Sequence, residues 1–155
     1  MRDPIWQNKS QNEFKEVISD ALRISSKGIL VALAASPLAH TSLVEAGFLA
    51  GEAAGGTIND HLRGLVTQEL LRWGINQLRP MGSESWSDEP WRQYNVLFYP
   101  YIEGMTFEQL AEKMAFSTQA VYKWRPKAVM ALTEILWKEV QTGANAQQRK
   151  NGVIQ

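Results

Sequence analysis

The stretch from Thr106 to Arg125, TFEQLAEKMAFSTQAVYKWR, limits the fold of this 155-residue chain more than any other. Thr106, with Gln109 three residues later, forms a capping box, which predicts that a helix begins there. Ser117 predicts a second helix start, and only residues 114–116 are left for the turn between the two. The apolar residues that recur at helical spacing are Phe107, Leu110, Ala111, Met114, Val121 and Trp124. We therefore expect two short helices packed across a three-residue turn, within an all-α fold.

The second of these helices has a polar and basic outer side. Lys plus Arg and Asp plus Glu are both 16 over the whole chain, yet the segment from Lys113 to Lys127 holds basic residues and no acidic one. An α-helix fits the major groove of DNA, where its N-terminal residues meet base edges. We therefore expect this helix to bind double-stranded DNA. The residues expected to contact DNA are Ser117, Thr118, Gln119, Tyr122, Lys123, Arg125 and Lys127.

These side chains are suited to different parts of a DNA site. Gln119 can pair with adenine through two hydrogen bonds, and Lys123 and Arg125 can contact guanine or phosphate. Thr118 and the amide groups beside Ser117 suit a phosphate at a helix N-terminus. We expect the N-terminal end of the helix to enter the groove first.

The same pattern has a simpler interpretation as one helix of an ordinary helical hairpin. Lys123, Arg125 and Lys127 would then be a solvated basic face, and Tyr122 would pack against protein instead of stacking on a base. If the protein binds DNA through this face, its affinity for DNA falls steeply as the salt concentration rises. A plain helical hairpin would show no such salt-dependent binding.

Residues 91–140 resemble region 4 of bacterial sigma factors and the related LuxR-type helix-turn-helix. Those families have a "Y-x-E-G-[LM]-[ST]-x-E-E-[IL]-A" segment, and this chain has YIEGMTFEQLA at residues 101–111. They have "L-G-[IV]-S" at the turn, where this chain has MAFS at residues 114–117. The resemblance implies a helix-turn-helix that reads duplex DNA, in a transcriptional regulator or a DNA-recognition subunit.

Pro126 lies where a recognition helix would still be running. A proline inside a helix removes one backbone hydrogen bond and clashes with the preceding turn. We therefore expect the recognition helix to be shortened or kinked there, which would disturb base reading. A separate final amphipathic helix is expected at residues 128–141.

An N-terminal helical module is expected over residues 11–79. Its first helix begins near Gln11 and ends before Gly28, which can take positive φ without strain. Residues 29–35 have the composition of a short buried strand, but their alanines favour a buried helix. Ser36 followed by Pro37 predicts the start of another short helix, which would run to about Glu45.

A long helix is expected to close this module. Thr57 is its predicted cap, Asp60 the acidic partner of that cap, and Pro80 lies beyond its end. Its predicted core stripe is Ile58, Leu62, Leu65, Val66, Leu70, Trp73 and Leu78. Of the six tryptophans, those at helical core spacing are Trp73, Trp124 and Trp137, and those expected beside loops are Trp6, Trp86 and Trp91.

The module also resembles bacterial proteins that place an "A-L-R…L-A-x-S-P-L" helical segment ahead of a helix-turn-helix. This chain has ALR at residues 21–23 and LAASPL at residues 33–38. That resemblance implies no defined activity. Independently of that resemblance, a protein partner bound through the module is among the expectations for this chain.

Other classes of function find little support in the residues. The chain has no cysteine and only two histidines, His40 and His61, neither at metal-ligand spacing, so we expect no metal and no other cofactor. No nucleophile elbow or phosphate-binding loop is present, so we expect no enzyme. No segment has the length of a membrane span or the pattern of a signal peptide, which favours a cytoplasmic protein.

The expected organisation is a helical module at 11–79 and a DNA-binding domain at 90–141, with flexible tails at 1–10 and 142–155. A homodimer is expected because one short recognition helix reads few base pairs. The contact would come from the module or from the final helix. The alternative is a non-enzymatic adaptor whose helices bind a protein partner.

Overall fold

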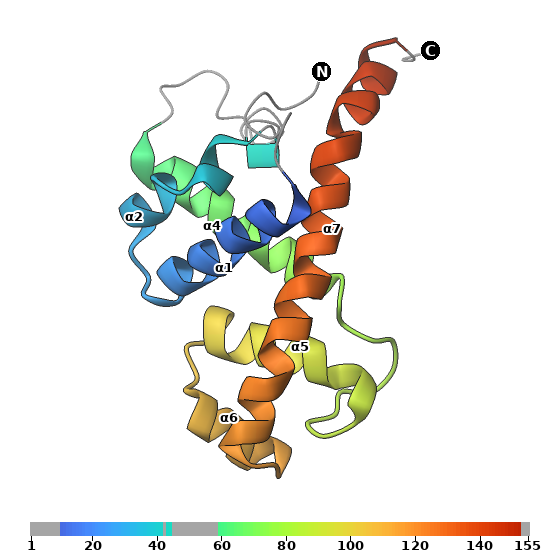
Figure 1. Cartoon of the computed structure of the whole chain (residues 1–155). Helices are drawn as coiled ribbons and strands as arrows, with labels where there is room; N and C mark the ends of the chain where they lie inside the picture. Colours follow the sequence, from blue (N-terminus) through green and yellow to red (C-terminus); the bar gives the residue numbers. More distant parts are fainter. Residues whose placement is uncertain (1–9, 42, 45–58, 153–155) are drawn as a thin grey trace.

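The computed structural model describes residues 10–41, 43–44 and 59–152, with side chains as far as Gln141. Within these ranges every regular element is a helix, which confirms the all-α prediction (Figure 1). The elements are α1 (Gln11–Ser26), α2 (Leu30–Ala34), η2 (Pro37–His40), α4 (Asp60–Asn76), η4 (Glu89–Trp91), α5 (Arg92–Leu97), η5 (Phe98–Ile102), α6 (Phe107–Met114) and α7 (Thr118–Gly152).

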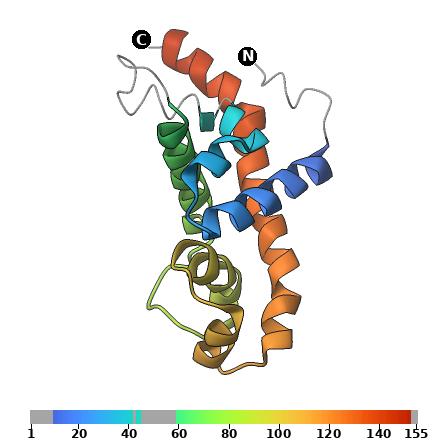
Figure 2. The same cartoon turned by 90° about the vertical axis from the view of Figure 1, so that its left-hand side faces the viewer.

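The long helix α7 packs against helices from both the N-terminal and the C-terminal half of the chain. Figures 1 and 2 show α5 and α6 beside its first turns and α1 and α4 beside its middle, with α2 packed on α4 on the side away from α7. One hydrophobic cluster runs through both groups, because Ile18, Ile75, Leu97, Leu110 and Leu132 all belong to it. The segments predicted as a module at 11–79 and a domain at 90–141 therefore share a core.

The first helix begins and ends as its sequence predicts. The Ser10 hydroxyl accepts a hydrogen bond from the Glu13 amide, and the Glu13 carboxylate accepts one from the Ser10 amide. At the other end Gly28 has φ 72°, the left-handed conformation that glycine adopts without strain. Ser10 is the one residue of the predicted tail at 1–10 that lies within the described ranges, and there it is a cap.

The long helix of the N-terminal region differs from its prediction in two respects. It begins at Asp60 with Asn59 as its cap, while the predicted cap Thr57 lies outside the described residues. Its buried face is Gly64, Thr67, Leu71, Gly74 and Ile75. Of the predicted core stripe, Leu65 and Trp73 are exposed, Leu62, Val66, Leu70 and Leu78 are half-buried, and Ile58 lies outside the described residues. The reason is close packing: a β-carbon at Gly64 would stand 2.0 Å from the carbonyl oxygen of Leu30 in α2.

The segment after Ser36 is shorter than predicted. The Ser36 hydroxyl accepts a hydrogen bond from the Leu38 amide and Pro37 occupies the first turn, as expected. The helix is a single 3₁₀ turn that ends at His40, and Thr41 is extended.

The chain between α4 and α6 is pinned by aromatic packing and by Asn95. The buried Asn95 amide donates hydrogen bonds to the carbonyl oxygens of Ser85 and Trp86, at 3.0 and 3.2 Å. Pro100 cannot donate to the helix, and the backbone around it forms a π-turn in which the Glu103 amide bonds to the Phe98 carbonyl. The regular α-helix is therefore interrupted at Pro100, and the chain turns toward α6.

The prediction of two separate helices on either side of Pro126 is wrong. α7 continues through Pro126 and its backbone stays helical to Gly152, beyond the start of the predicted tail at 142. Pro126 itself is exposed, while Val121 before it and Ala128 and Val129 after it are buried in the core. Packing on both sides of the proline outweighs the loss of one backbone hydrogen bond.

Two tyrosines in this region give a testable pH dependence. Burial raises the pKa of Tyr94 and of Tyr99 above the ordinary value of 10.0. Above that pH the folded protein keeps protons that the unfolded chain loses, so the free energy of unfolding falls as pH rises. We expect wild type to lose more stability between about pH 9 and about pH 11 than the Tyr94→Phe, Tyr99→Phe double variant, measured by urea denaturation. Equal losses in both proteins would contradict this.

Candidate nucleic-acid interface

The helices α6 and α7 each begin at the cap that the sequence predicts. Thr106 and Gln109 form the reciprocal capping box of α6, with hydrogen bonds of 3.0 and 3.1 Å. The Ser117 hydroxyl accepts from the Ala120 amide at 3.1 Å at the start of α7. Between them Ala115 has φ 62°, and the Phe116 amide bonds back to the Ala111 carbonyl. This closes α6 at Met114, and α7 begins at Thr118 after three intervening residues.

An arginine that the sequence did not single out holds this turn in place. The guanidinium of Arg92, from α5, lies over the rings of Phe116 and Trp124, with its carbon 5.0 and 4.6 Å from their centroids. The two rings meet edge to face at 4.8 Å, and Glu89 lies 3.8 Å from the Arg92 side chain. The contact joins α5, the turn and α7. No local pattern signals it, because its members come from three elements.

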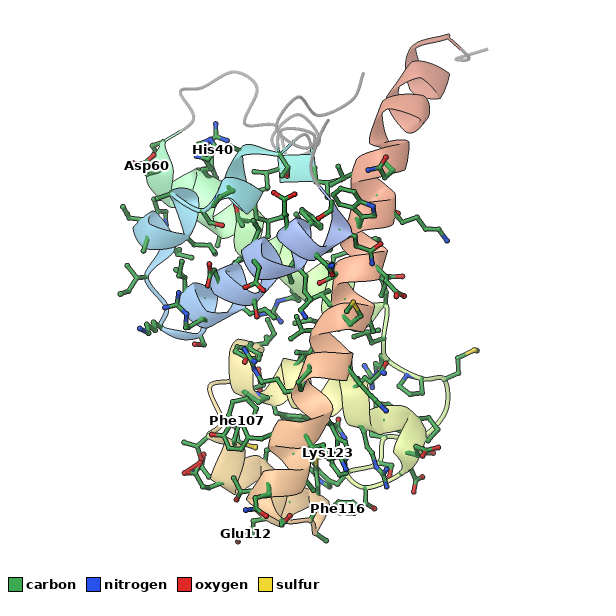
Figure 3. The ribbon with its side chains drawn as sticks, viewed as in Figure 1. His40, Asp60, Phe107, Glu112, Phe116 and Lys123 are labelled. Carbon is green, nitrogen blue, oxygen red and sulfur yellow. The ribbon has the colours of Figure 1, made fainter. Side chains whose placement is uncertain are left out.

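Three of the predicted DNA contacts form an open row on α7. Gln119, Lys123 and Lys127 are exposed and recur every four residues, about 6 Å apart along the helix axis. Figure 3 labels Lys123 on the open side of α7, near the α6 turn. Within the side chains that the structure describes, α7 carries no acidic residue before Glu134. The row therefore presents an amide and two ammonium groups on a stretch of α7 that carries no carboxylate before Glu134.

The other predicted contacts are placed differently. Ser117 is exposed and occupied as a cap, and Thr118 is half-buried beside it. Tyr122 is 49% exposed, with its ring against Phe107 of α6 at a centroid distance of 4.8 Å. These residues border the row without belonging to it.

Arg125 turns away from the row and packs on the π-turn. It is half-buried, its Nε donates a hydrogen bond to the Tyr101 hydroxyl, and its guanidinium carbon lies 5.7 Å from the Tyr101 ring centroid. In this conformation Arg125 stabilises the fold, and its availability to DNA is lower than that of Lys123.

This difference leads to a prediction for two alanine variants. Arg125→Ala is expected to lower the free energy of unfolding by about 1–2 kcal/mol, because it removes a charge-assisted hydrogen bond. Its effect on DNA affinity is expected to be smaller than that of Lys123→Ala, which leaves the fold intact. Urea denaturation and DNA titration of both variants measure this. A stable Arg125→Ala protein that binds DNA as weakly as Lys123→Ala would contradict it.

Acidic residues mark one border of the candidate interface. An open hollow of about 520 Å³ lies between the end of the π-turn and α6, lined by Glu103, Gly104, Met105, Gln109, Glu112 and Lys113. Figure 3 shows Glu112 at the α6 end of the molecule. The carboxylates of Glu103 and Glu112 in this hollow would repel a phosphate backbone, so DNA would approach more favourably over α7.

Other kinds of site are not visible in the part of the chain that the structure describes. No group of three acidic, histidine or cysteine side chains is placed to hold a metal among the residues described. His40 Nε2 lies 3.0 Å from the Ala34 carbonyl oxygen, which is a structural contact. Searched over the same residues, no helix combines the length and the apolar character that crossing a bilayer requires.

Comparison with known proteins finds no relative of this chain. The resemblance of residues 91–140 to sigma region 4 and LuxR-type domains therefore stays a prediction from the residues quoted above. No protein-family model matches the chain, and no curated protein or solved structure is significantly similar to it.

Proposed function

We propose that this protein binds duplex DNA through α6 and α7, acting as a helix-turn-helix in a transcriptional regulator or a DNA-recognition subunit. The observation that carries the proposal is the open row of Gln119, Lys123 and Lys127, on a helix that starts directly after a tight turn. A row of this kind places hydrogen-bonding and cationic groups where base edges and phosphates would lie.

The roles of the row follow from position and chemistry. Gln119 is in the first turn of α7 and is proposed to meet a base edge, with adenine as its best partner. Lys123, one turn further, is proposed to contact guanine or phosphate. Lys127 is proposed to contact phosphate, and Ser117 and Thr118 offer the helix N-terminus to a phosphate of the other strand.

The test is selection of duplexes from a random-site pool by the full-length protein, followed by titration at two salt concentrations. We expect an enriched motif, and a slope of log affinity against log salt of about −0.9 for each phosphate contacted. A folded protein that enriches no sequence and shows no salt-dependent binding would exclude the proposal.

A second candidate function is that of an adaptor that binds another protein. The outer side of α4 carries Leu65 and Trp73, which are 39% and 40% exposed, and α2 presents Val31, which is 57% exposed. Exposed apolar side chains at this density favour a protein contact, with a second copy of the chain among the partners. If the protein binds no DNA, this side of α4 is the first place to substitute in a search for the partner.

A further inference from the structure

The side of α7 that carries Lys123 is exposed near the start of the helix, and α1 covers the same side further along. Lys123, Met130 and Trp137 recur every seven residues, so they lie on one side of α7. Lys123 is exposed, whereas Trp137 is covered by Phe14 of α1 at a ring centroid distance of 5.2 Å. Figure 2 shows α1 crossing α7 and projecting beyond it. A molecule lying on the row would therefore meet α1 at its far end.

A groove lies in the corner between α1 and α7. It encloses about 410 Å³ and is lined by Lys15, Gln93, Pro126, Lys127, Met130, Ala131 and Glu134. Lys127, the last member of the row, belongs to it, so the groove continues the row. Lys15 comes from α1 and Gln93 from α5, which makes this corner a meeting point of three helices.

The lining of the groove suits a sugar–phosphate strand. Lys15 and Lys127 supply two ammonium groups, Gln93 supplies an amide, and the single carboxylate is that of Glu134. Among the residues that the structure describes, neither lysine forms an ion pair. Pro126, Met130 and Ala131 give an apolar floor on which deoxyribose can lie. Two cations that form no ion pair with any described residue, beside an apolar floor, favour the DNA backbone over an acidic peptide, which lacks the sugar.

We propose that Lys15 contacts a phosphate that flanks the site read by α7, so that α1 is part of the DNA-binding surface. This inference rests on the proposed function and extends it to the N-terminal region. The phosphate that Lys15 contacts lies beyond the one contacted by Lys127, because the row leads from Gln119 through Lys127 into the groove. The bound duplex is thus longer than one recognition helix alone would cover.

The absence of cysteine from the chain allows a direct test by site-specific cleavage. Lys15→Cys, Lys123→Cys and Lys27→Cys would each carry an iron chelate that cleaves nearby DNA backbone, with the duplex enriched from the random-site pool as the probe. Lys27 is the matched control, because it is an exposed lysine at the opposite end of α1. We expect the position 123 conjugate to cut inside the enriched motif, the position 15 conjugate to cut beside it, and the position 27 conjugate not to cut.

A salt titration gives a second readout that does not depend on the chelate. Lys15→Gln is expected to reduce the slope of log affinity against log salt by about 0.9, the value for one phosphate contact, while Lys27→Gln leaves it unchanged. Cutting at position 123 without cutting at position 15, together with an unchanged slope for Lys15→Gln, would overturn the role of Lys15 and leave the proposed function standing. A wild-type protein that binds no duplex would overturn both.

Discussion

Reversing the charge of Lys123 and Lys127 together is expected to lower the affinity for duplex DNA by roughly 100- to 1,000-fold. Each contact of this kind is worth about 1–3 kcal/mol, and every 1.4 kcal/mol is about a factor of ten. The double variant Lys123→Glu, Lys127→Glu also adds repulsion between two carboxylates and the phosphate backbone. The expected loss is largest at low salt, where the electrostatic part of binding is strongest.

Both lysines are exposed on α7, and the fold does not depend on them. The variant is therefore expected to unfold at the same denaturant concentration as wild type, which separates a binding defect from a folding defect. Arg125 is left unchanged because its guanidinium packs on Tyr101. Its substitution would mix the two effects.

The matched control reverses two basic residues at the same spacing on α1. Arg23→Glu with Lys27→Glu changes the net charge by the same amount, on exposed positions four residues apart. If net charge alone governs binding, both double variants will lose affinity equally. If the α7 row is the interface, the α1 variant will stay within a few-fold of wild type. An equal loss in the two proteins would contradict a DNA contact through α7.

Gly64→Ala is expected to lower the free energy of unfolding by about 3 kcal/mol, which is at the upper end of the usual range for overpacking a core. An alanine β-carbon at this position would stand 2.0 Å from the Leu30 carbonyl oxygen and 2.7 Å from the Leu30 carbonyl carbon. Both atoms are backbone, so relief requires α2 and α4 to move apart. At roughly 2–4 °C per kcal/mol for a chain of this size, the melting temperature is expected to fall by roughly 6–12 °C.

Gly74→Ala is the matched control on the same helix. There a β-carbon would meet the ends of two leucine side chains, 2.6 Å from Leu132 Cδ1 and 3.2 Å from Leu136 Cδ2. Side-chain methyl groups can rotate away, and alanine is favoured over glycine inside a helix by about 1 kcal/mol. We expect Gly74→Ala to lie within about 1 kcal/mol of wild type. Equal melting temperatures for the two variants, measured by circular dichroism, would contradict the close approach of α2 to α4.

The local signals in the sequence predicted the local structure well. Ser36, Thr106 and Ser117 cap the segments that they were expected to cap, and Gly28 ends α1, whereas Ser10 was assigned to a tail and is a cap. These predictions succeed because a capping hydrogen bond joins residues two or three positions apart. The all-α class follows from the same signals. The candidate row on α7 was also identified from sequence, since Gln119, Lys123 and Lys127 are among the residues predicted to contact DNA.

Helical spacing alone did not identify which side of a helix is buried. In α4 the leucine-rich stripe was predicted to face the core, but the structure buries two glycines, Thr67, Leu71 and Ile75. The tryptophans behave in the same way: Trp73 was expected in the core and is 40% exposed, whereas Trp91 was expected beside a loop and is 4% exposed. Helical spacing shows which residues share one side of a helix, but the packing of neighbouring helices decides which side is buried.

By itself the sequence determined the all-α class, the caps Ser36, Thr106 and Ser117 and the position of the tight turn, because hydrogen bonds and steric limits between near neighbours set these features. Only the tertiary structure decided that α7 continues through Pro126, that Arg125 packs on Tyr101, that Arg92 lies against Phe116 and Trp124, and that Lys15 stands at the end of the α7 row. Each of these depends on residues from different helices. Their contacts form when the core packs, and no spacing along the chain encodes them.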